Sequence, residues 1–318
     1  MTSPALNPAA PSAPRAAHGR MHLLMLLVTV CWASNIIAGK EALTGFGPLA
    51  LAQVRVLGVA IIYALCFLPA GGLRHLHLPR RIWWFLAAMA LNGVALNQLT
   101  FIGGMARSTV AHTGLIVAMG PVMVLVIAVL IRLEPLTAGK LAGMMIAFAG
   151  AGILTSDKAG QGIAAHWAGD LILLVGTMVF AVYIILVKEV VNDLDGLTLN
   201  TITFVLGALI MLPFCAHALV NTPWASISPK AWWGLAFLVI PGSAISYMIF
   251  AYVMTELPAS RVAAFSYLQP VIASGLGIWV LSERLTAKVV IGGSLILAGV
   301  YLAERERGEK KDAGDSEG

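Results

Sequence analysis

The sequence predicts an all-α membrane protein in which ten transmembrane helices form two inverted five-helix repeats. Hydrophobic residues make up 59% of the 318 residues and charged residues only 11%, and the mean hydropathy is +0.88. A soluble domain of this size could not bury so many apolar side chains, so the lipid bilayer is the expected partner. The other two observations are a series of apolar runs and an internal repeat.

Each apolar run has about the 20 residues that cross a hydrocarbon core as a helix. The runs lie at 22–43, 48–69, 82–105, 108–131, 136–155, 168–191, 197–220, 230–255, 259–281 and 286–303. Backbone groups cannot remain unpaired in lipid, and no run alternates like a barrel strand, so helices are the expected spanning form.

Residues 1–21 are predicted to be a disordered, proline-rich tail and residues 304–318 a charged tail. The first run lacks a cleavage site and is expected to stay attached.

The repeat is clearest where Pro121 returns as Pro270 and Glu134 as Glu283, in each case 149 residues later. The Trp-Trp pair at 83–84 returns at 232–233 with the same offset. The sequence therefore predicts one five-helix repeat over residues 22–155 and a second over residues 168–303. Because five is an odd number, the second repeat enters the membrane upside down. Such halves can open one face and then the other around a site near the midplane.

Basic residues predict the orientation. Thirteen Lys and Arg residues fall in links on the side of the N-terminus and six on the opposite side, which favours cytoplasmic termini. The expected location is the plasma (bacterial inner) membrane. The net charge of +5 follows from this topology, so nucleic acid is not an expected partner. The three cysteines lie in apolar runs without metal-ligand spacing, and neither a metal, a cofactor nor a catalytic residue is predicted.

Several of these residues occur in the same order as in a known family. They are Trp32-Ala-Ser-Asn35, Lys40, Arg55, Asn97, Pro121, Pro270, Glu134, Glu283 and the glycines at 143, 150, 292 and 299. Over about residues 21–303 the chain resembles the EamA-type family of the drug/metabolite transporter superfamily. The resemblance implies a ten-helix exporter of small metabolites such as amino acids, purine-type metabolites or toxic cations. It does not specify the substrate.

Polar and aromatic residues inside the runs are the candidates for a substrate cavity. Trp32 and Asn35 share one helix face, and Tyr183 occupies a twin position in the second repeat. The predicted cavity residues are Trp32, Asn35, Arg55, Asn97, Gln98, His112, Tyr183, Ser246, Tyr247, Tyr267 and Gln269. The alternative is that these side chains serve helix packing or interhelical hydrogen bonds.

Arg55 breaks the symmetry of the repeat because its twin position holds Thr203 or Phe204. A charge inside a membrane helix needs a partner. Structural pairing, contact with an anionic group of the substrate and snorkelling toward the surface all remain open.

Two prolines and two glutamates are candidates for moving parts. Pro121 and Pro270 interrupt helical hydrogen bonding and are predicted hinges, although packing kinks are the alternative. Glu134 and Glu283 lie at helix ends near opposite surfaces. Each is predicted to latch its own side against a nearby base, with capping of the following helix as the alternative.

All fifteen acidic residues fall at helix ends, in links or in the tail, so no carboxylate is available for an ion relay at mid-membrane. His112 is the single deep group that could titrate near neutral pH. The sequence therefore predicts a carrier for small amphipathic metabolites that works by alternating access, as a monomer or homodimer, with amino acids as the first candidates. Facilitated diffusion is favoured over proton coupling. The alternatives are proton-coupled efflux of drugs or toxic compounds, an intramembrane enzyme and a channel.

Overall fold

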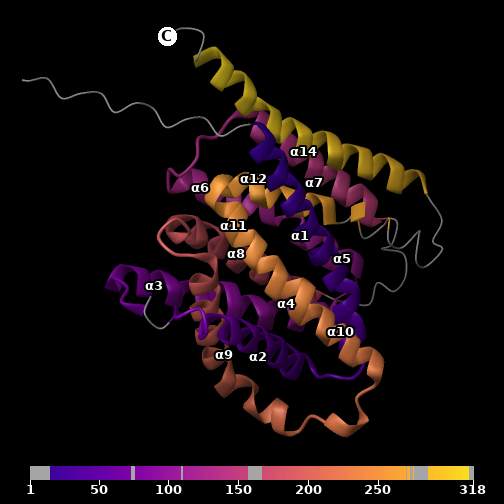
Figure 1. The fold of residues 1–318 in the computed structure, drawn as a ribbon. Coiled ribbons are helices and arrows are strands. Elements are labelled where there is room, and N and C mark those ends of the chain that lie inside the picture. The colour runs from indigo at the N-terminus through magenta and orange to yellow at the C-terminus, as the bar shows by residue number, and fades with distance from the viewer. Residues whose placement is uncertain are drawn as a thin grey trace, which may run out of the picture.

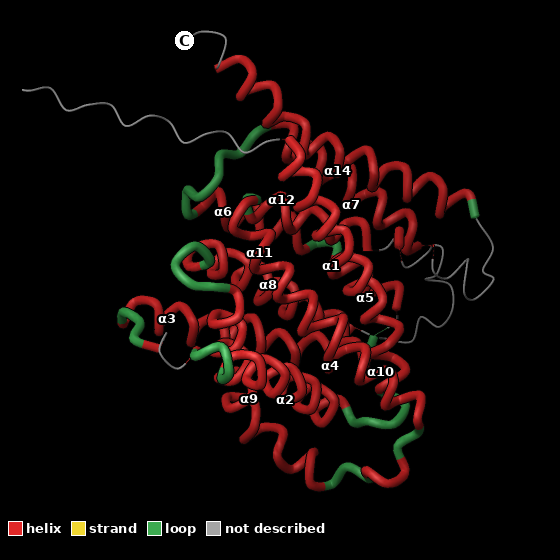
Figure 2. Tube along the Cα trace, in the orientation of Figure 1, coloured by secondary structure: helices red, strands yellow, loops and turns green. Residues whose placement is uncertain are grey.

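The computed structural model describes residues 15–72, 76–108, 110–156, 167–269, 271–272, 275 and 286–314. Within these ranges the regular elements are helices and no strand occurs (Figure 2). Six helical segments are long and apolar enough to cross a membrane: Gly19–Ala42, Pro48–Phe67, Arg80–Arg107, Trp167–Val190, Gly196–Val220 and Pro229–Glu256. Shorter apolar helices cover Gly120–Leu130, Ala138–Ile153 and Val290–Leu302. The chain is therefore a multi-pass helical membrane protein.

The first half of the described chain covers residues 15–156, and its regular elements are helical. Its elements are α1 (Arg15–Ala42), α2 (Pro48–Phe67), α3 (Arg80–Met89), the π-helical η2 (Ala90–Leu96), α4 (Asn97–Arg107), α5 (Val110–Val117), α6 (Gly120–Leu130) and α7 (Ala138–Ser156). The elements α3, η2 and α4 follow one another without a break and form one span.

The second half repeats this plan. Its elements are α8 (Trp167–Val190), α9 (Gly196–Val220), the short η3 (Trp224–Ser226), α10 (Pro229–Val239), the π-helical η4 (Ile240–Ile245), α11 (Ser246–Glu256), α12 (Ala259–Ala264), η5 (Phe265–Tyr267) and α14 (Ala287–Gly314). A π-helical segment interrupts the same span in both halves, at η2 and at η4. The predicted run at 259–281 lies partly outside the described residues.

Local sequence signals fix several helix starts. Pro48 and Pro229 occupy the first turns of α2 and α10, where a missing N–H costs nothing. The Asp195 carboxylate accepts a hydrogen bond from the backbone N–H of Thr198 at 2.9 Å and caps α9. Ser228 caps α10 in the same way.

Helices with equivalent positions in the two halves lie side by side. In Figure 1, α7 packs along α14 at one end of the bundle, and α2 packs along α9 at the other end. A Cβ atom built on Gly150 would lie 2.7 Å from the carbonyl oxygen of Gly292, and one built on Gly299 would lie 2.5 Å from that of Gly143. The helices α7 and α14 are therefore antiparallel, and their backbones meet through small residues.

A second pair of close contacts also recurs at equivalent positions. A Cβ atom built on Gly242 would lie 1.9 Å from the side-chain oxygen of Asn35, and one built on Gly93 would lie 1.9 Å from the ring of Tyr183. Both glycines belong to the π-helical segments. Glycine is required at both places because any side chain would occupy the space of its neighbour.

Two lysines bind the ends of equivalent helices. Lys40 Nζ donates a hydrogen bond to the carbonyl oxygen of Ser108, directly after α4, at 2.8 Å. Lys188 Nζ donates to that of Leu257, directly after α11, at 3.0 Å. Cations at helix C-termini satisfy carbonyl groups that have no partner within the helix.

The outer surface carries many large apolar side chains, as expected for contact with lipid. The tryptophans at the starts of α3 and α10 belong to it, with Trp84 66% and Trp233 77% exposed. Tryptophan is typical of the membrane interface, so both helix starts are expected at headgroup level.

The glycine contacts generate the first prediction. Gly93→Ala and Gly242→Ala should each destabilise the protein by about 1 to 3 kcal/mol, because the added methyl overlaps Tyr183 or Asn35. Gly114→Ala in α5 is the control, since nothing lies within 4 Å of its position. Thermal unfolding in detergent measures the effect. Equal midpoints for all three variants would contradict the packing described.

Candidate functional site

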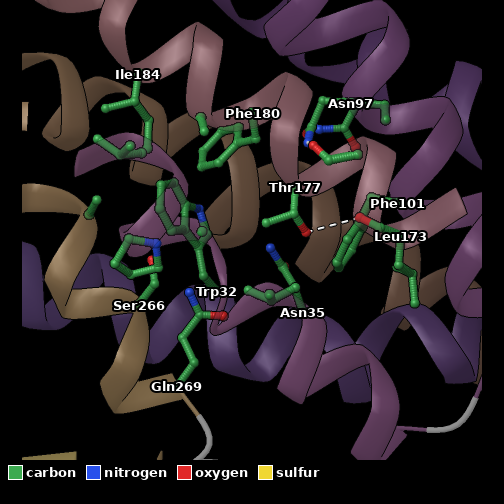
Figure 3. A pocket seen from close by; sticks show the side chains of 18 of the residues that line it. Trp32, Asn35, Asn97, Phe101, Leu173, Thr177, Phe180, Ile184, Ser266 and Gln269 are labelled. Atoms are coloured by element: carbon green, nitrogen blue, oxygen red, sulfur yellow. Dashed lines mark hydrogen bonds between the residues drawn. The ribbon is translucent and has the colours of Figure 1, made fainter. Parts of the chain in front are cut away.

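A cavity of about 100 Å³ lies between helices of both halves. Its lining from the first half comprises Trp32, Asn35, Arg55, Asn97, Gln98, Phe101, Val117, Gly120, Pro121 and Val124. Its lining from the second half comprises Leu173, Gly176, Thr177, Phe180, Ala181, Ile184, Tyr247, Ala263, Ser266 and Gln269. Figure 3 shows Trp32 between Phe180 and Gln269, with Thr177 and Asn35 beside it.

Aromatic rings form one wall of the cavity. The ring of Trp32 in α1 meets that of Phe180 in α8 edge-on, with centroids 5.7 Å apart, and that of Tyr247 in α11 at 6.0 Å. Tyr183 stacks on Phe180 at 5.6 Å and is fully buried. Such ring contacts hold the wall between the halves, and Trp32 adds aromatic surface to the cavity lining.

The π-helical η4 supplies acceptors to two polar side chains of the first half that line the cavity. Asn35 Nδ2 donates to the carbonyl oxygen of Gly242 at 3.1 Å. Arg55 Nε donates to Ser243 Oγ at 3.0 Å, and Arg55 Nη2 approaches the carbonyl oxygen of Gly242 at 3.5 Å. A π-helical turn alters the regular backbone pairing, and such turns are frequent at functional sites.

A second polar group lies on α4. Asn97 Nδ2 donates to the carbonyl oxygen of Gly176 in α8 at 3.3 Å. Gln98 is buried beside it on α4, and its Oε1 atom has no hydrogen-bond partner. Asn97 therefore both holds two helices together and lines the cavity, and Gln98 lines it as well.

The structure brings most of the predicted cavity residues together. Those that line the cavity are Trp32, Asn35, Arg55, Asn97, Gln98, Tyr247 and Gln269. Three others are buried but are not among the lining residues: Tyr183, Ser246 and Tyr267. Ser246 Oγ donates to the carbonyl oxygen of Pro241 at 2.6 Å, so its hydroxyl serves its own helix. The side chain of His112, and Pro270 and Glu283, lie outside the part of the chain that the structure describes.

Four further polar or aromatic residues line the cavity: Phe101, Thr177, Phe180 and Ser266. The repeat gives a signal for one of them, because Phe180 stands 148 residues after Trp32. Thr177 lies one turn earlier on the same face of α8. The sequence offers no comparable signal for Ser266, whose place depends on the course of the chain through η5.

Pro121 coincides with a break in its span. The helix α5 ends at Val117, and α6 begins at Gly120, directly before Pro121, which also lines the cavity. Proline is favourable in the first turn of a helix but cannot continue one. The break therefore places two half-helices, rather than one rigid rod, at the cavity wall.

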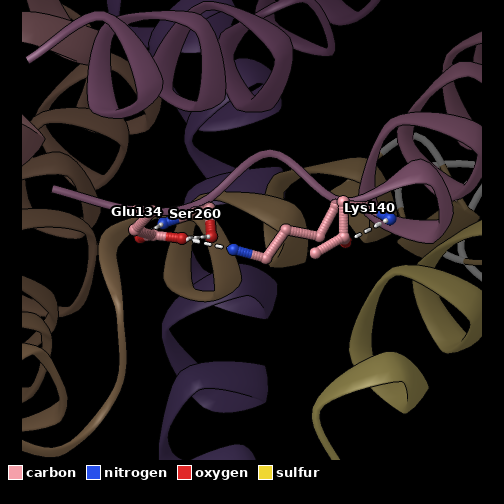
Figure 4. A network of polar contacts seen from close by, with 4 residues as sticks. Glu134, Lys140 and Ser260 are labelled. Carbon is pink, nitrogen blue, oxygen red and sulfur yellow. Dashed lines mark hydrogen bonds and ion pairs between the residues drawn. The ribbon is translucent and has the colours of Figure 1, made fainter. Parts of the chain in front are cut away.

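Glu134 joins the two halves beyond this span (Figure 4). Its Oε1 atom accepts a hydrogen bond from the backbone N–H of Ser260 in α12 at 3.0 Å, and its Oε2 atom accepts from Ser260 Oγ. Lys140 Nζ in α7 lies 2.7 Å from Oε2, and all three residues are buried. Thr137, rather than Glu134, accepts from the first turn of α7. The carboxylate thus caps α12 of the other half.

The environment keeps Glu134 ionised. Burial raises the pKa of its carboxyl, but the hydrogen bonds from Lys140 and Ser260 and the charge of Lys140 outweigh burial, so the pKa lies below its ordinary value. The two halves are therefore joined by a paired ion at neutral pH.

Together, the spans and this cavity define a class: a multi-pass helical membrane protein with a polar and aromatic cavity between two halves. The model of the EamA-like transporter family matches the chain twice, at residues 19–156 and 167–304. The chain belongs to the EamA-like transporter family.

Similar proteins extend over nearly the whole chain. An uncharacterized transporter of Archaeoglobus fulgidus is 27% identical over 293 residues, which cover 90% of this chain and 97% of the relative. A probable terminal-alkyne amino-acid exporter of Streptantibioticus cattleyicolor is 25% identical and covers 91% of this chain and 95% of its own. A solved crystal structure matches the fold with a TM-score of 0.72 at 18% identity, over 90% of this chain and 96% of that one.

Replacement of Glu134 tests the network that joins the halves. Because the folded-state pKa is lowered, its stabilising contribution is present above the ordinary glutamate pKa and is lost as the pH falls through the lowered pKa. Glu134→Gln should therefore lower the free energy of unfolding by about 3 kcal/mol at neutral pH, since Lys140 is left buried and unpaired.

Thermal unfolding of the variant and the wild type across pH measures this effect. The difference between the two midpoints should stay constant from about pH 6 to about pH 8 and shrink in acid. The control is Glu256→Gln, because Glu256 is exposed at the end of α11. A difference that grows as the pH falls would contradict the assignment.

Proposed function

We propose that the protein is a secondary carrier that exports small metabolites through the cavity by alternating access, with amino acids and related amphipathic compounds as the first candidates. The observation that carries this proposal is the cavity itself, because its aromatic and amide lining comes from both halves of a membrane protein. Such a lining suits a small molecule with polar ends and an apolar body. The relative from Streptantibioticus cattleyicolor, named a probable amino-acid exporter, supports the substrate class.

The carrier is proposed to have ten transmembrane helices in two inverted repeats. Reciprocal contacts support this arrangement: Gly150 meets Gly292 while Gly299 meets Gly143, and each contact is the other one with the halves exchanged. Reciprocal contacts of this kind are expected where a two-fold axis relates two equivalent elements. The antiparallel course of α7 and α14 supports an axis in the membrane plane, as alternating access requires.

Glu134 and Pro121 are proposed to form the moving parts on one side of the cavity. The Glu134 carboxylate ties the link before α7 to the first turn of α12, so its release would separate the two halves there. The break before Pro121 lets α6 move without α5. Glu283 and Pro270 are proposed as their counterparts on the other side. With cytoplasmic termini in the inner membrane, the Glu134 network is the cytoplasmic gate.

The cavity is small for a substrate site. Its volume of about 100 Å³ is below the roughly 300 Å³ at which typical ligand pockets begin. Substrate entry then requires that one side of the cavity widens. A channel would instead keep a continuous path, and its flux would not saturate with substrate concentration.

An efflux assay tests the proposal. Cells that express the protein are loaded with labelled amino acids and nucleosides, and the rate of release is compared with that of cells carrying the empty vector. At least one compound should leave faster, with a rate that saturates. Failure of the whole panel, or release that rises linearly with concentration, would count against an exporter of these compounds.

Replacement of Trp32 links the release to the cavity. Trp32→Ala removes the aromatic wall and should lower efflux of the transported compound by about 10-fold, because an aromatic contact with substrate is lost. Trp84→Ala is the matched control, since Trp84 is 66% exposed on the outer surface and does not line the cavity. Equal efflux by both variants would place the substrate elsewhere.

A further inference from the structure

We propose that Arg55 binds the carboxylate of the transported molecule, which defines the substrates as carboxylates with an apolar or aromatic body. This inference rests on the proposed carrier function and narrows its substrate class. It predicts that the protein binds carboxylates but not amines of the same shape, and that the Arg55 side chain is responsible for this selectivity.

Arg55 is a buried charge, and no opposite charge lies beside it in the described part of the chain. Its side chain lies in α2, is 3% exposed and lines the cavity. Its hydrogen-bond partners are neutral: the Ser243 hydroxyl and, at 3.5 Å, the Gly242 carbonyl. The remaining nitrogen, Nη1, is buried and has no hydrogen-bond partner. Among the described residues, no carboxylate pairs with this guanidinium, which leaves both a charge and a donor for a ligand.

A carboxylate is the ligand that this geometry suits. A guanidinium presents its N–H donors as a rigid fork that matches the two oxygens of a carboxylate, and charge-assisted bonds of this kind are short and strong. An ammonium group would be repelled by the same charge. None of the other lining residues is acidic, so the described lining offers no ionic partner for an amine.

The aromatic wall defines the rest of the ligand. Trp32 and Phe180 line the same cavity as Arg55, and their rings meet edge-on. A molecule with its carboxylate at Arg55 can lay an apolar body against these rings. The amide oxygen of Gln98 is buried without a partner and can accept a hydrogen bond from a polar substituent on that body.

The asymmetry of the repeat limits the site to one anion. The twin position of Arg55 is occupied by Thr203 or Phe204, both buried and uncharged, so the described lining holds a single cation. If this charge were needed only for folding, both of the symmetric halves would be expected to carry it. One carboxylate per cavity is therefore the expected stoichiometry.

Matched ligands test the inference on the purified full-length protein in lipid nanodiscs. The probes are 3-phenylpropionate, phenethylamine and phenylalanine, which carry the same ring with a carboxylate, an amine or both. The wild type should bind 3-phenylpropionate and phenylalanine but not phenethylamine. Arg55→Gln should weaken binding of both carboxylates by about 10- to 100-fold, the usual range for loss of a charge-assisted contact.

Two further variants separate recognition from folding. Gln53→Met removes another buried polar side chain of α2, one that donates to Ala208 and does not line the cavity, and it should leave binding unchanged. Arg55→Lys keeps the charge but loses the fork, and it should weaken binding several-fold while phenethylamine stays excluded. If Arg55→Gln does not fold, the binding measurements on Arg55→Lys test the inference in its place.

Three results would overturn the inference: binding of phenethylamine as tight as that of 3-phenylpropionate, carboxylate binding that is indifferent to both Arg55 variants, or a folded wild type that binds neither carboxylate. A failure of the proposed carrier function would give a different result from a failure of this inference. In the efflux assay no compound would then leave the cells faster than it leaves cells with the empty vector, whereas saturable release of nucleosides alone would retain the carrier and reject the role of Arg55.

Discussion

Close backbone contact between the two halves is the constraint on which the structure depends. In hydrocarbon, helices gain nothing from hiding apolar side chains from one another, so their association relies on tight packing and on paired polar groups. Gly242 allows Asn35 to reach its carbonyl oxygen at 3.1 Å, and Gly93 admits the ring of Tyr183. These contacts fix α1 against α10 and α11, and α8 against α3 and α4. The cavity is the space that they leave between the halves.

The contacts around the cavity combine packing with a site for ligand. Asn35 donates to the Gly242 carbonyl oxygen of η4 and Arg55 donates to the Ser243 hydroxyl of η4, yet both side chains line the cavity. Polar groups in a membrane protein must be paired or face a cavity, and here the same side chains do both. Holding the site with residues from both halves means that any separation of the halves changes the site. That coupling is what a carrier needs.

Several of the predicted helices match the structure closely, because length and hydropathy are local properties. The apolar runs at 48–69, 168–191 and 197–220 correspond closely to α2, α8 and α9. The predicted cavity residues were harder to place, because position along a helix does not give its rotation against neighbours. Trp32 and Phe180 line the cavity, whereas Tyr183, one turn from Phe180, packs behind it. The π-helical η4 changes the angular positions of the residues after it, so the places of Ser246 and Tyr247 could not be read from a regular helical period.

The sequence pattern also could not predict contacts between residues that lie far apart in the sequence. A base near Glu134 was predicted, and Lys140 lies six residues away, but Ser260 comes from the other half of the chain. Arg55 was left with three possible roles because its neighbours were unknown. In the structure the neighbours of Arg55 are a hydroxyl and a carbonyl group. Arg55 is therefore not paired with an acidic residue in the described part of the chain.

The central claim is that one cavity opens to the two sides of the membrane in turn. Its most direct test locks one gate with a disulfide between Glu134→Cys and Ser260→Cys in a background without the native cysteines, with Ser266→Cys as a reporter in the cavity. Membrane-impermeant maleimide should then label position 266 from the outside but not from the cytoplasm, and efflux should stop until the disulfide is reduced. Labelling from the cytoplasm, or undiminished efflux, with the disulfide in place would contradict alternating access through this cavity.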